Sequence, residues 1–397
     1  MPKNIIVCAD GTWNGPATQG GPEPIDGEDD RGEFIVPPIT NVVKIFGNLI
    51  GYSIPATIGL ANEQEISFSS PAGEVQQVAK YLHGVGDSAN LLNKLLGGAF
   101  GMGIIARIVR GYTFISRHYQ AGDAIHIVGF SRGAYTARAL AGMIARVGLL
   151  DPRTYDPEDK ETAYRLAIAA WAKSKSVSIS PASPLSAISN TFVDFIQAFV
   201  ASGLGPNSLI PNVPVKSVAV WDTVGAMGVP KYMQGKRYDL FRFVDDKLSP
   251  RVEHGFHAMA IDELRIDFPV TQWERRDGVL QCWFVGSHAD VGGGYPADQS
   301  QLSDNALAWM MKQLRSVGVL FVSPPPHAPK PAVLGVPVHT PWTKPPFSAL
   351  GRSPRKVETA DFIHTSVLNR WTADDGYRPS AMQDFVNKPA NSFHILE

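Results

Sequence analysis

The chain has 397 residues, enough to bury a large core, and this length fits either two domains or one α/β domain with insertions. Its 36 Lys and Arg residues nearly balance its 37 Asp and Glu residues, which excludes the broad basic surface typical of a nucleic-acid-binding protein. The two cysteines, Cys8 and Cys282, lie in apolar runs and provide neither a disulfide framework nor a zinc-binding motif. We therefore expect a globular protein with no nucleic-acid partner.

No stretch of the sequence predicts a membrane span or a leader peptide. The apolar run at the N-terminus is too short for a signal peptide. The most membrane-like stretch, 91–109, is interrupted by Lys94 and Arg107. The sequence predicts no integral membrane segment and leaves open transient contact with a membrane surface. We expect a cytoplasmic location, or export without a cleavable signal peptide.

The N-terminal part of the chain predicts a strand, a loop and a helix. Residues 5–9 (IIVCA) are a compact apolar run, typical of a strand in a parallel sheet that is covered on both faces. A turn cluster at 10–14 and a polar loop at 15–40 follow. Asn41 is the expected N-cap of a helix that runs through Ile50. Further along, we expect a strand at 80–84 and an amphipathic helix at 104–119.

One serine lies between a predicted strand and a predicted helix. Ile125, Ile127 and Val128 form a short apolar strand, which breaks at GFSRG (129–133) into a helical pattern over 134–147. This arrangement predicts the nucleophile elbow of α/β-hydrolases, with Ser131 exposed at the turn. Chance alone would supply such a G-x-S-x-G pattern in about one chain in five of this composition, so the strand and helix around it carry the prediction.

Two later strands also end at polar residues. The run 215–221 ends at Asp222, and the run 279–285 is followed by His288, Asp290 and three glycines. A helix is expected at 303–314. Strands that alternate with helices predict an α/β-hydrolase-like, doubly wound and mostly parallel sheet, in which ligands bind beyond the carboxyl ends of the strands.

We expect a single domain over 1–397 with two irregular parts. Residues 151–214 predict a helical insertion, which is either a cap or lid or an additional helical layer that only packs. Residues 323–346 are proline-rich and predict a loop without a core of its own.

The order of the polar residues along the chain suggests a catalytic triad. In α/β-hydrolases the nucleophilic serine precedes the acid, and the acid precedes the histidine. Here Ser131 precedes Asp222, which precedes His288. His288 would take the Ser131 proton and Asp222 would hold the imidazole tautomer. The alternatives to this histidine are His364, in FIHTSV, and His254 and His257, which fall in a stretch expected to be helical. Asp290 is the alternative acid.

The oxyanion hole and the cofactor requirement can also be predicted. The backbone N–H groups of Arg132 and Gly11 are the expected oxyanion donors, with Asp10 and Thr12 in the same loop as Gly11. Asp10 and Asp290 could alternatively share a divalent cation, but two carboxylates with no further evident ligand make a poor site. We therefore expect no metal ion and no cofactor.

A family likeness appears once these motifs are taken together. They are ADGTWN (9–14), YLHGVGD (81–87), VGFSRGAYTARALAGMI (128–144), AVWDTVGAMG (219–228), HAMAIDELR (257–265), WFVGSHADVGGGY (283–295), LSDNALAWM (302–310) and HTSVLNRW (364–371). In this order they resemble the domain-of-unknown-function 2235 family, which is similar to the catalytic domain of type VI secretion phospholipase effectors. The resemblance implies an α/β-hydrolase fold, serine-dependent lipolysis with phospholipids as the leading substrates, and the triad roles of Ser131, Asp222 and His288. His364 also matches a family motif.

The sequence therefore predicts a serine esterase that acts on carboxylic esters of lipids or phospholipids through an acyl-enzyme. The alternatives on the same fold are a thioesterase, a peptidase or a metal-assisted phosphoesterase. A non-catalytic, hydrolase-like binding domain is a further alternative. The expected partner is an ester or lipid substrate, and the residues identify no protein partner such as an immunity protein.

Overall fold

A computed structural model describes most of the chain. The described residues are 2–11, 39–54, 63–83, 100–176, 203–205, 207–224, 232–233, 236–237, 247–345, 347–349, 351–385 and 393–397.

The centre of the molecule is a 10-stranded sheet in the order β14-β13-β12-β11-β8-β5-β1-β4-β3-β2. Neighbouring strands from β14 to β4 are parallel, whereas β3 and β2 continue one edge in antiparallel pairing. The strands are β1 (Asn4–Ala9), β2 (Tyr52–Ser53), β3 (Glu63–Ser69), β4 (Val75–Leu82), β5 (Ala124–Phe130), β8 (Val215–Trp221), β11 (Val252–Ala260), β12 (Val279–Phe284), β13 (Phe362–His364) and β14 (His394–Leu396). The predicted α/β class with a mostly parallel sheet is confirmed.

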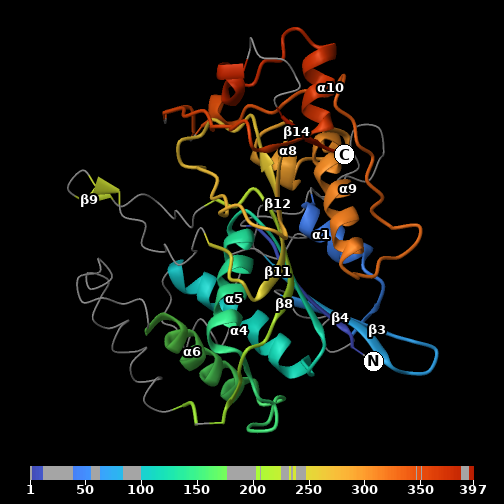
Figure 1. Ribbon diagram of the computed structural model, residues 1–397, viewed down its shortest axis with the longest axis vertical. Helices are drawn as coiled ribbons and strands as arrows, with labels where there is room; N and C mark the ends of the chain where they lie inside the picture. Colours follow the sequence, from blue (N-terminus) through green and yellow to red (C-terminus); the bar gives the residue numbers. More distant parts are fainter. Residues whose placement is uncertain are drawn as a thin grey trace, which may run out of the picture.

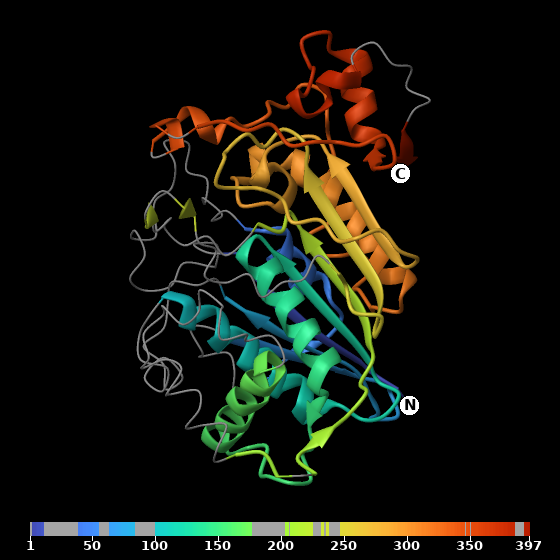
Figure 2. The ribbon, with the colours of Figure 1, turned by 60° about the vertical axis from the view of Figure 1, so that its left-hand side comes forward.

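Helices cover both faces of this sheet (Figures 1 and 2). On one face lie α4 (Phe100–His118), α5 (Arg132–Val147) and α6 (Lys160–Ser176), and on the other lie α1 (Asn41–Asn48) and α9 (Gln301–Ser316). Two shorter helices, α8 (His288–Gly292) and α10 (Thr365–Ala373), follow β12 and β13. The other elements within the described residues are β6 (Leu149–Leu150) with β7 (Leu209–Ile210), β9 (Tyr232–Met233) with β10 (Lys236–Arg237), and the 3-10 turns η2 (Ala297–Gln299), η3 (Pro341–Thr343), η4 (Phe347–Ala349) and η5 (Ser380–Phe385).

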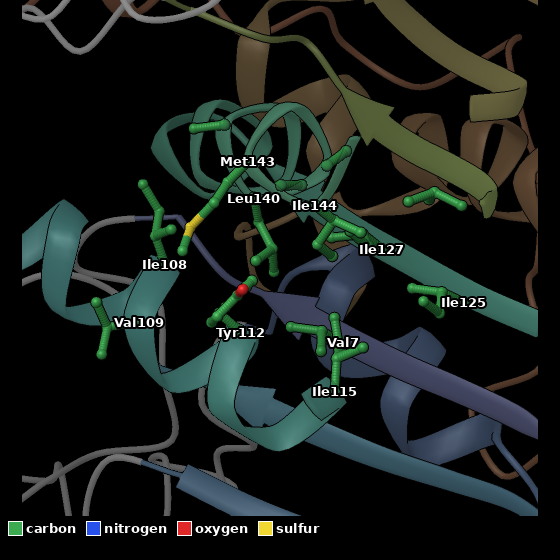
Figure 3. Close-up of a cluster of buried hydrophobic side chains, with 14 of the residues drawn as sticks. Val7, Ile108, Val109, Tyr112, Ile115, Ile125, Ile127, Leu140, Met143 and Ile144 are labelled. Carbon is green, nitrogen blue, oxygen red and sulfur yellow. The ribbon is translucent and has the colours of Figure 1, made fainter. Parts of the chain in front are cut away.

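The apolar run of β1 is explained by burial on both faces. Val7 packs with the side chains of α4 and α5 (Figure 3), and Ile5 belongs to the same cluster, whereas Ile6 and Cys8 pack with the side chains of α1 and α9. All four side chains are at most 1% exposed. A strand in the middle of a parallel sheet has no solvated face, so it carries a continuous apolar run instead of an alternating one.

Two local predictions are corrected by the structure. His254 and His257 lie on the parallel strand β11, so the helix expected there is wrong. A residue pattern of this length does not separate a buried strand from a buried helix, and pairing with β8 and β12 decides the conformation. The N-cap of α1 is Thr40, whose Oγ1 accepts the Val43 N–H at 3.2 Å. The Asn41 side chain instead donates to the carbonyls of Val291 on α8 and Ser303 on α9.

The described portions of the two irregular parts pack against different elements of the protein. In the 151–214 segment, α6 packs against α4, α5 and β6, where Ile168 and Trp171 are buried. This portion forms a packing layer, while residues 177–202 lie outside the described residues. The proline-rich stretch is described over 323–345 and contains η3. It is tied to the body of the protein by the pairing of Asn48 with the His327 backbone and by His339, which contacts Asp290.

The sheet topology predicts where a ligand should bind. β1 and β5 are neighbours, but α1 follows β1 onto one face and α5 follows β5 onto the other. A crevice opens beyond the carboxyl ends of strands at such a switch point. Asp10 and Gly11 follow β1 at this edge, and Ser131 follows β5. The next strand along, β8, ends immediately before Asp222.

Candidate active site

Ser131 occupies a strained turn between β5 and α5. Its φ of 56° and ψ of −121° fall outside the regions that ordinary residues populate. The turn is held in place because the Ser131 N–H donates to Trp221 O at 3.2 Å and its carbonyl accepts from the Tyr135 N–H at 3.2 Å. A Cβ atom on Gly129 would lie 2.4 Å from Gly133 O, so the strand and the helix approach too closely for a side chain. This is the geometry of a nucleophile elbow.

The second glycine of the turn gives a first prediction. A Cβ on Gly133 would lie 2.0 Å from Ala9 O and 2.5 Å from Asp10 O, both of them backbone atoms at the end of β1. Gly133→Ala should therefore destabilise the protein by about 1–3 kcal/mol, as overpacking does in rigid cores. Gly142→Ala is the matched control on the same helix, because a Cβ there meets nothing within 4 Å. It should be neutral or stabilise by up to about 1 kcal/mol. Denaturant unfolding measures both, and equal stabilities of the two variants would contradict the geometry.

Asp222 and His288 meet at the ends of β8 and β12. His288 Nδ1 lies 2.5 Å from Asp222 Oδ2. Asp222 has a positive φ of 39°, and its N–H donates to Ala258 O at 2.7 Å. Its other carboxylate oxygen, Oδ1, accepts the Ala260 N–H at 2.9 Å. Asp222 and His288, which lie 66 positions apart in the sequence, are thus in direct contact. The Asp222 carboxylate has a fixed orientation.

Arg355 is a member of this site that the sequence did not reveal. Its Nη1 donates to Asp222 Oδ1 at 2.5 Å and its Nη2 to Asp222 Oδ2 at 2.9 Å. Burial alone would raise the pKa of Asp222, but the Arg355 guanidinium and the hydrogen bond with His288 hold that pKa well below its usual range. Arg355 lies in a segment without a strand or helix, where neither periodicity nor a motif marks it.

The His288 ring lies among aromatic side chains. Phe130 and Phe268 place their ring centroids 4.6 Å and 5.1 Å from that of His288. Phe347 packs edge-on against Phe268, and the His288 N–H donates to Glu263 Oε2 at 3.1 Å. Burial lowers the pKa of His288 below its ordinary value, although Asp222 acts in the opposite direction. The ring therefore favours its neutral form.

This pKa shift predicts the pH dependence of any reaction in which His288 acts as a base. A base must be unprotonated, so activity should rise as the pH increases through the pKa of His288. Because burial lowers that pKa, the acidic half-point should fall below pH 6.5. Burial also raises the pKa of Asp10 to about 6, so activity alone does not assign the half-point. The ring resonances of His288, followed by NMR and assigned with His288→Gln, report it directly. A midpoint above 6.5 would contradict the prediction.

The Ser131 hydroxyl makes no hydrogen bond to the His288 ring in this structure, although both residues are described. The residues next to them in the sequence are in contact with the site. Phe130, which precedes Ser131, contacts the His288 ring, and the Ser131 N–H donates to the carbonyl of Trp221, which precedes Asp222. Catalytic hydrogen bonds are often long without substrate and tighten when it binds. The pairing of Asp222 with His288 is thus present, and the pairing of His288 with Ser131 stays a prediction.

The loop after β1 is held by a buried carboxylate. Asp10 accepts hydrogen bonds from Thr40 Oγ1 (2.9 and 2.8 Å), from Tyr81 OH (2.6 Å) and from the Gly11 N–H (2.6 Å). The predicted oxyanion donor Gly11 therefore gives its N–H to Asp10 in this conformation. Arg132 is the first residue of α5, so its N–H lies at the amino end of the helix, where first-turn amides serve external acceptors. Thr12 lies outside the described residues.

The alternative residues lie elsewhere or have other partners. Asp290 Oδ2 accepts from the Ser287 N–H at 2.9 Å, capping α8, and Asp290 Oδ1 lies 2.6 Å from His339 Nδ1. His364 is the N-cap of α10, where its Nδ1 accepts the Ser366 N–H at 3.2 Å. His257 Nε2 accepts the Thr223 N–H at 3.1 Å. Among these histidines, the geometry favours His288 as the partner of Asp222.

The described residues form neither a metal-binding cluster nor a membrane-spanning helix. No cluster of three or more His, Cys, Asp or Glu side chains arranged to hold a metal ion occurs among the described residues. Asp10 and Asp290, which could have shared a cation, each bind the hydroxyl, amide or imidazole partners given above. Of the helices that the structure describes, none has the length and apolar character that a membrane crossing requires.

Comparison with known proteins identifies the family. Residues 3–313 match the model of the catalytic domain of Tle1-like phospholipase effectors of the type VI secretion system. The chain belongs to this family. The match covers β1, β5, β8 and β12 and therefore Ser131, Asp222 and His288, whereas Arg355 lies beyond its end. The resemblance to type VI secretion phospholipase effectors that the motifs indicated is confirmed.

Individual relatives of this Tle1-like domain are more distant. The uncharacterized protein YEL023C of Saccharomyces cerevisiae is 33% identical over 153 residues, which make up 37% of this chain and 18% of the yeast protein. The crystal structure of an uncharacterized protein from Pseudomonas aeruginosa aligns with a TM-score of 0.42 and 15% identity, over 95% of this chain and 51% of that one. The Tle1 effector bound to the VgrG spike aligns with a TM-score of 0.36 and 18% identity, over 76% and 52%. This chain thus spans about half the length of either solved chain and less than a fifth of the yeast protein.

Proposed function

We propose that the chain is a serine hydrolase that cleaves carboxylic esters of lipids, phospholipids above all, through an acyl-enzyme on Ser131. The observation that carries this proposal is the 2.5 Å contact between His288 Nδ1 and Asp222 Oδ2, at strand ends next to the strained Ser131 turn. The chain belongs to the family of Tle1-like phospholipase effector catalytic domains, and this membership supports phospholipids as the substrate class. The same description supports export and transient contact with a membrane surface.

The proposed reaction has two halves that share one base. His288 Nε2 takes the proton of Ser131 as Oγ forms a bond to the ester carbonyl carbon. The bond from that carbon to the leaving oxygen breaks, and the alcohol departs with the proton from His288. Water then attacks the acyl group while His288 accepts its proton, and the fatty acid leaves as Ser131 regains a hydrogen. The reaction calls on no metal ion or cofactor.

Asp222 and the start of α5 have supporting roles in this reaction. Asp222 accepts the Nδ1 proton of His288, so that Nε2 faces the serine as the acceptor, and it stabilises the imidazolium that forms. The N–H of Arg132 would donate to the oxyanion of the tetrahedral intermediate. A negative charge at this place is further favoured by the amino end of the 16-residue helix α5.

The surroundings of His288 suit an apolar acyl group. Phe268 and Phe347 are only half-buried and pack edge-on with ring centroids 5.7 Å apart. The Arg265 guanidinium lies 3.5 Å from the Phe268 centroid and 4.7 Å from that of Phe347. Aromatic side chains fixed in this way offer apolar surface to a ligand with little loss of side-chain entropy. Their position next to His288 supports a lipid ester over a small polar substrate.

Product analysis tests the proposal. The purified chain is incubated with a short-chain phosphatidylcholine, and both fatty acid and phosphate-containing products are quantified with and without EDTA. We expect fatty acid and lysophospholipid in equal amounts at a rate that EDTA does not change. Release of the phosphorylated head group, or loss of turnover in EDTA, would instead indicate a metal-assisted phosphoesterase. Turnover of a thioester or a peptide without turnover of the lipid would indicate one of the other hydrolase classes.

A further inference from the structure

Both terminal nitrogens of the Arg355 guanidinium make two hydrogen bonds each, although the residue lies outside any helix or strand. Besides its two hydrogen bonds to Asp222, its Nη1 donates to Ala260 O at 2.6 Å and its Nη2 to Phe268 O at 2.9 Å. The side chain is only 4% exposed. Four hydrogen bonds from one guanidinium thus join the Asp222 carboxylate to the end of β11 and to the loop beyond it, where Phe268 contacts His288.

These contacts restrict how Asp222 can face His288. Arg355 binds Oδ1 and Oδ2 together, a planar two-point contact that resists rotation of the carboxylate. The Ala260 N–H occupies Oδ1 as well, so Oδ2 is the oxygen presented to the imidazole. A lysine could supply the same charge but not the same two-point geometry.

The charges around His288 are balanced in pairs. Asp222, which contacts the His288 ring, is paired with Arg355, and Glu263, which contacts the His288 N–H, is paired with Arg265 at 2.9 and 2.8 Å. On the helix of His288 itself, Asp290 is bound to Ser287 and His339. His288 therefore lies between two carboxylates whose charges are each offset by an arginine, and loss of either arginine leaves an uncompensated negative charge beside the ring.

We propose that Arg355 is a positioning residue of the active site, which orients Asp222 toward His288 and offsets its charge. The segment beyond residue 313, where the match to the Tle1-like catalytic domain ends, is then part of the catalytic machinery of this chain. Figure 2 shows the red part of this segment at the same end of the sheet as the tip of β12. Phe347, which packs on Phe268, comes from the same segment. The catalytic consequence rests on the proposed function, whereas the effect on His288 does not.

The proposal predicts a change in the titration of His288. Without Arg355, the Asp222 charge is uncompensated and favours the protonated imidazole, so the midpoint should move upward by about one pH unit in Arg355→Gln. In Arg355→Lys the charge remains, and the midpoint should stay close to that of the unmodified protein. Arg370→Gln is the matched control, because Arg370 binds the carbonyls of Val333 and Val336 in the same C-terminal segment without a contact to Asp222. Its midpoint should be unchanged.

Turnover gives the second readout on the same variants. We expect Arg355→Lys to lower kcat about tenfold with little change in KM, since the carboxylate is less well oriented, while Arg370→Gln keeps the kcat of the unmodified protein. If Arg355→Gln does not fold, Arg355→Lys decides, and an unchanged kcat in that variant would overturn the proposal. An unchanged His288 midpoint in folded Arg355→Gln would overturn it too.

The two proposals fail in different ways. If the unmodified protein hydrolyses no ester, the proposed function is wrong, but the NMR titration of His288 still decides what Arg355 does. If the unmodified protein hydrolyses esters while Arg355→Gln and Arg370→Gln behave alike in both readouts, the function stands and Arg355 is merely a structural residue.

Discussion

Replacing Ser131 by Ala should lower ester turnover by at least about 10⁴-fold and abolish labelling by a fluorophosphonate. The hydroxyl supplies the bond-forming oxygen, and only the oxyanion donors and substrate binding remain without it, which give a small residual rate. Because no residue that the structure describes forms a hydrogen bond with Ser131 Oγ, its removal leaves none of them with an unsatisfied buried group. The melting temperature of Ser131→Ala should therefore stay close to that of the unmodified protein.

Ser217→Ala is the control for this experiment. Ser217 Oγ lies 2.8 Å from His126 Nδ1, so it is a buried serine beside a histidine, but it lies inside β8 and not at a turn. A fluorophosphonate should label Ser217→Ala as fully as the unmodified protein. Labelling or turnover of the ordinary magnitude in Ser131→Ala would contradict the assignment of Ser131 as the nucleophile.

Replacing Asp222 by Asn should lower kcat by about 10³–10⁴-fold, the second largest effect. An amide does not hold the Nδ1–H tautomer or stabilise the imidazolium as a carboxylate does. It also leaves the buried Arg355 guanidinium without its countercharge, and breaking such a pair costs about 3–5 kcal/mol of folding free energy. The kcat must therefore be expressed per folded molecule, with the folded fraction taken from the unfolding curve under assay conditions.

Asp290→Asn separates the acid of the triad from a carboxylate that is merely close to His288 in sequence. Asp290 caps α8 and binds His339, so its replacement should cost about 0.5–2 kcal/mol of stability, as loss of a cap does. Its kcat should stay within a few-fold of the unmodified value. A larger loss of kcat in Asp290→Asn than in Asp222→Asn would reverse the assignment of the acid.

The sequence predicted the residues of the site that are marked by a local sequence pattern. Ser131, Asp222 and His288 each follow an apolar strand run, and strand ends of a parallel sheet meet at one edge. The structure accordingly brings Asp222 into contact with His288. The fold class followed from the same alternation of strands and helices, and the strand expected at 215–221 has the bounds of β8.

What the sequence did not reveal depends on contacts between distant segments. Arg355 reaches Asp222 across 133 positions from a stretch with no periodic pattern, so nothing local marks it. β11 has a single β-branched residue, Val252, and takes its conformation from pairing with β8 and β12. The Gly11 N–H donates to the Asp10 side chain. Residue types alone do not determine which nearby acceptor this N–H binds.

One measurement decides whether Ser131 is the nucleophile. The protein is quenched rapidly in acid during hydrolysis of a short-chain ester, and its peptides are then mapped by mass spectrometry. We expect a mass increase equal to the acyl group on the peptide that contains Ser131, formed faster than the fatty acid is released or at the same rate. The adduct should be absent in Ser131→Ala. Steady turnover with the acyl group on another residue, or with no acylated peptide under single-turnover conditions, would contradict the proposed mechanism.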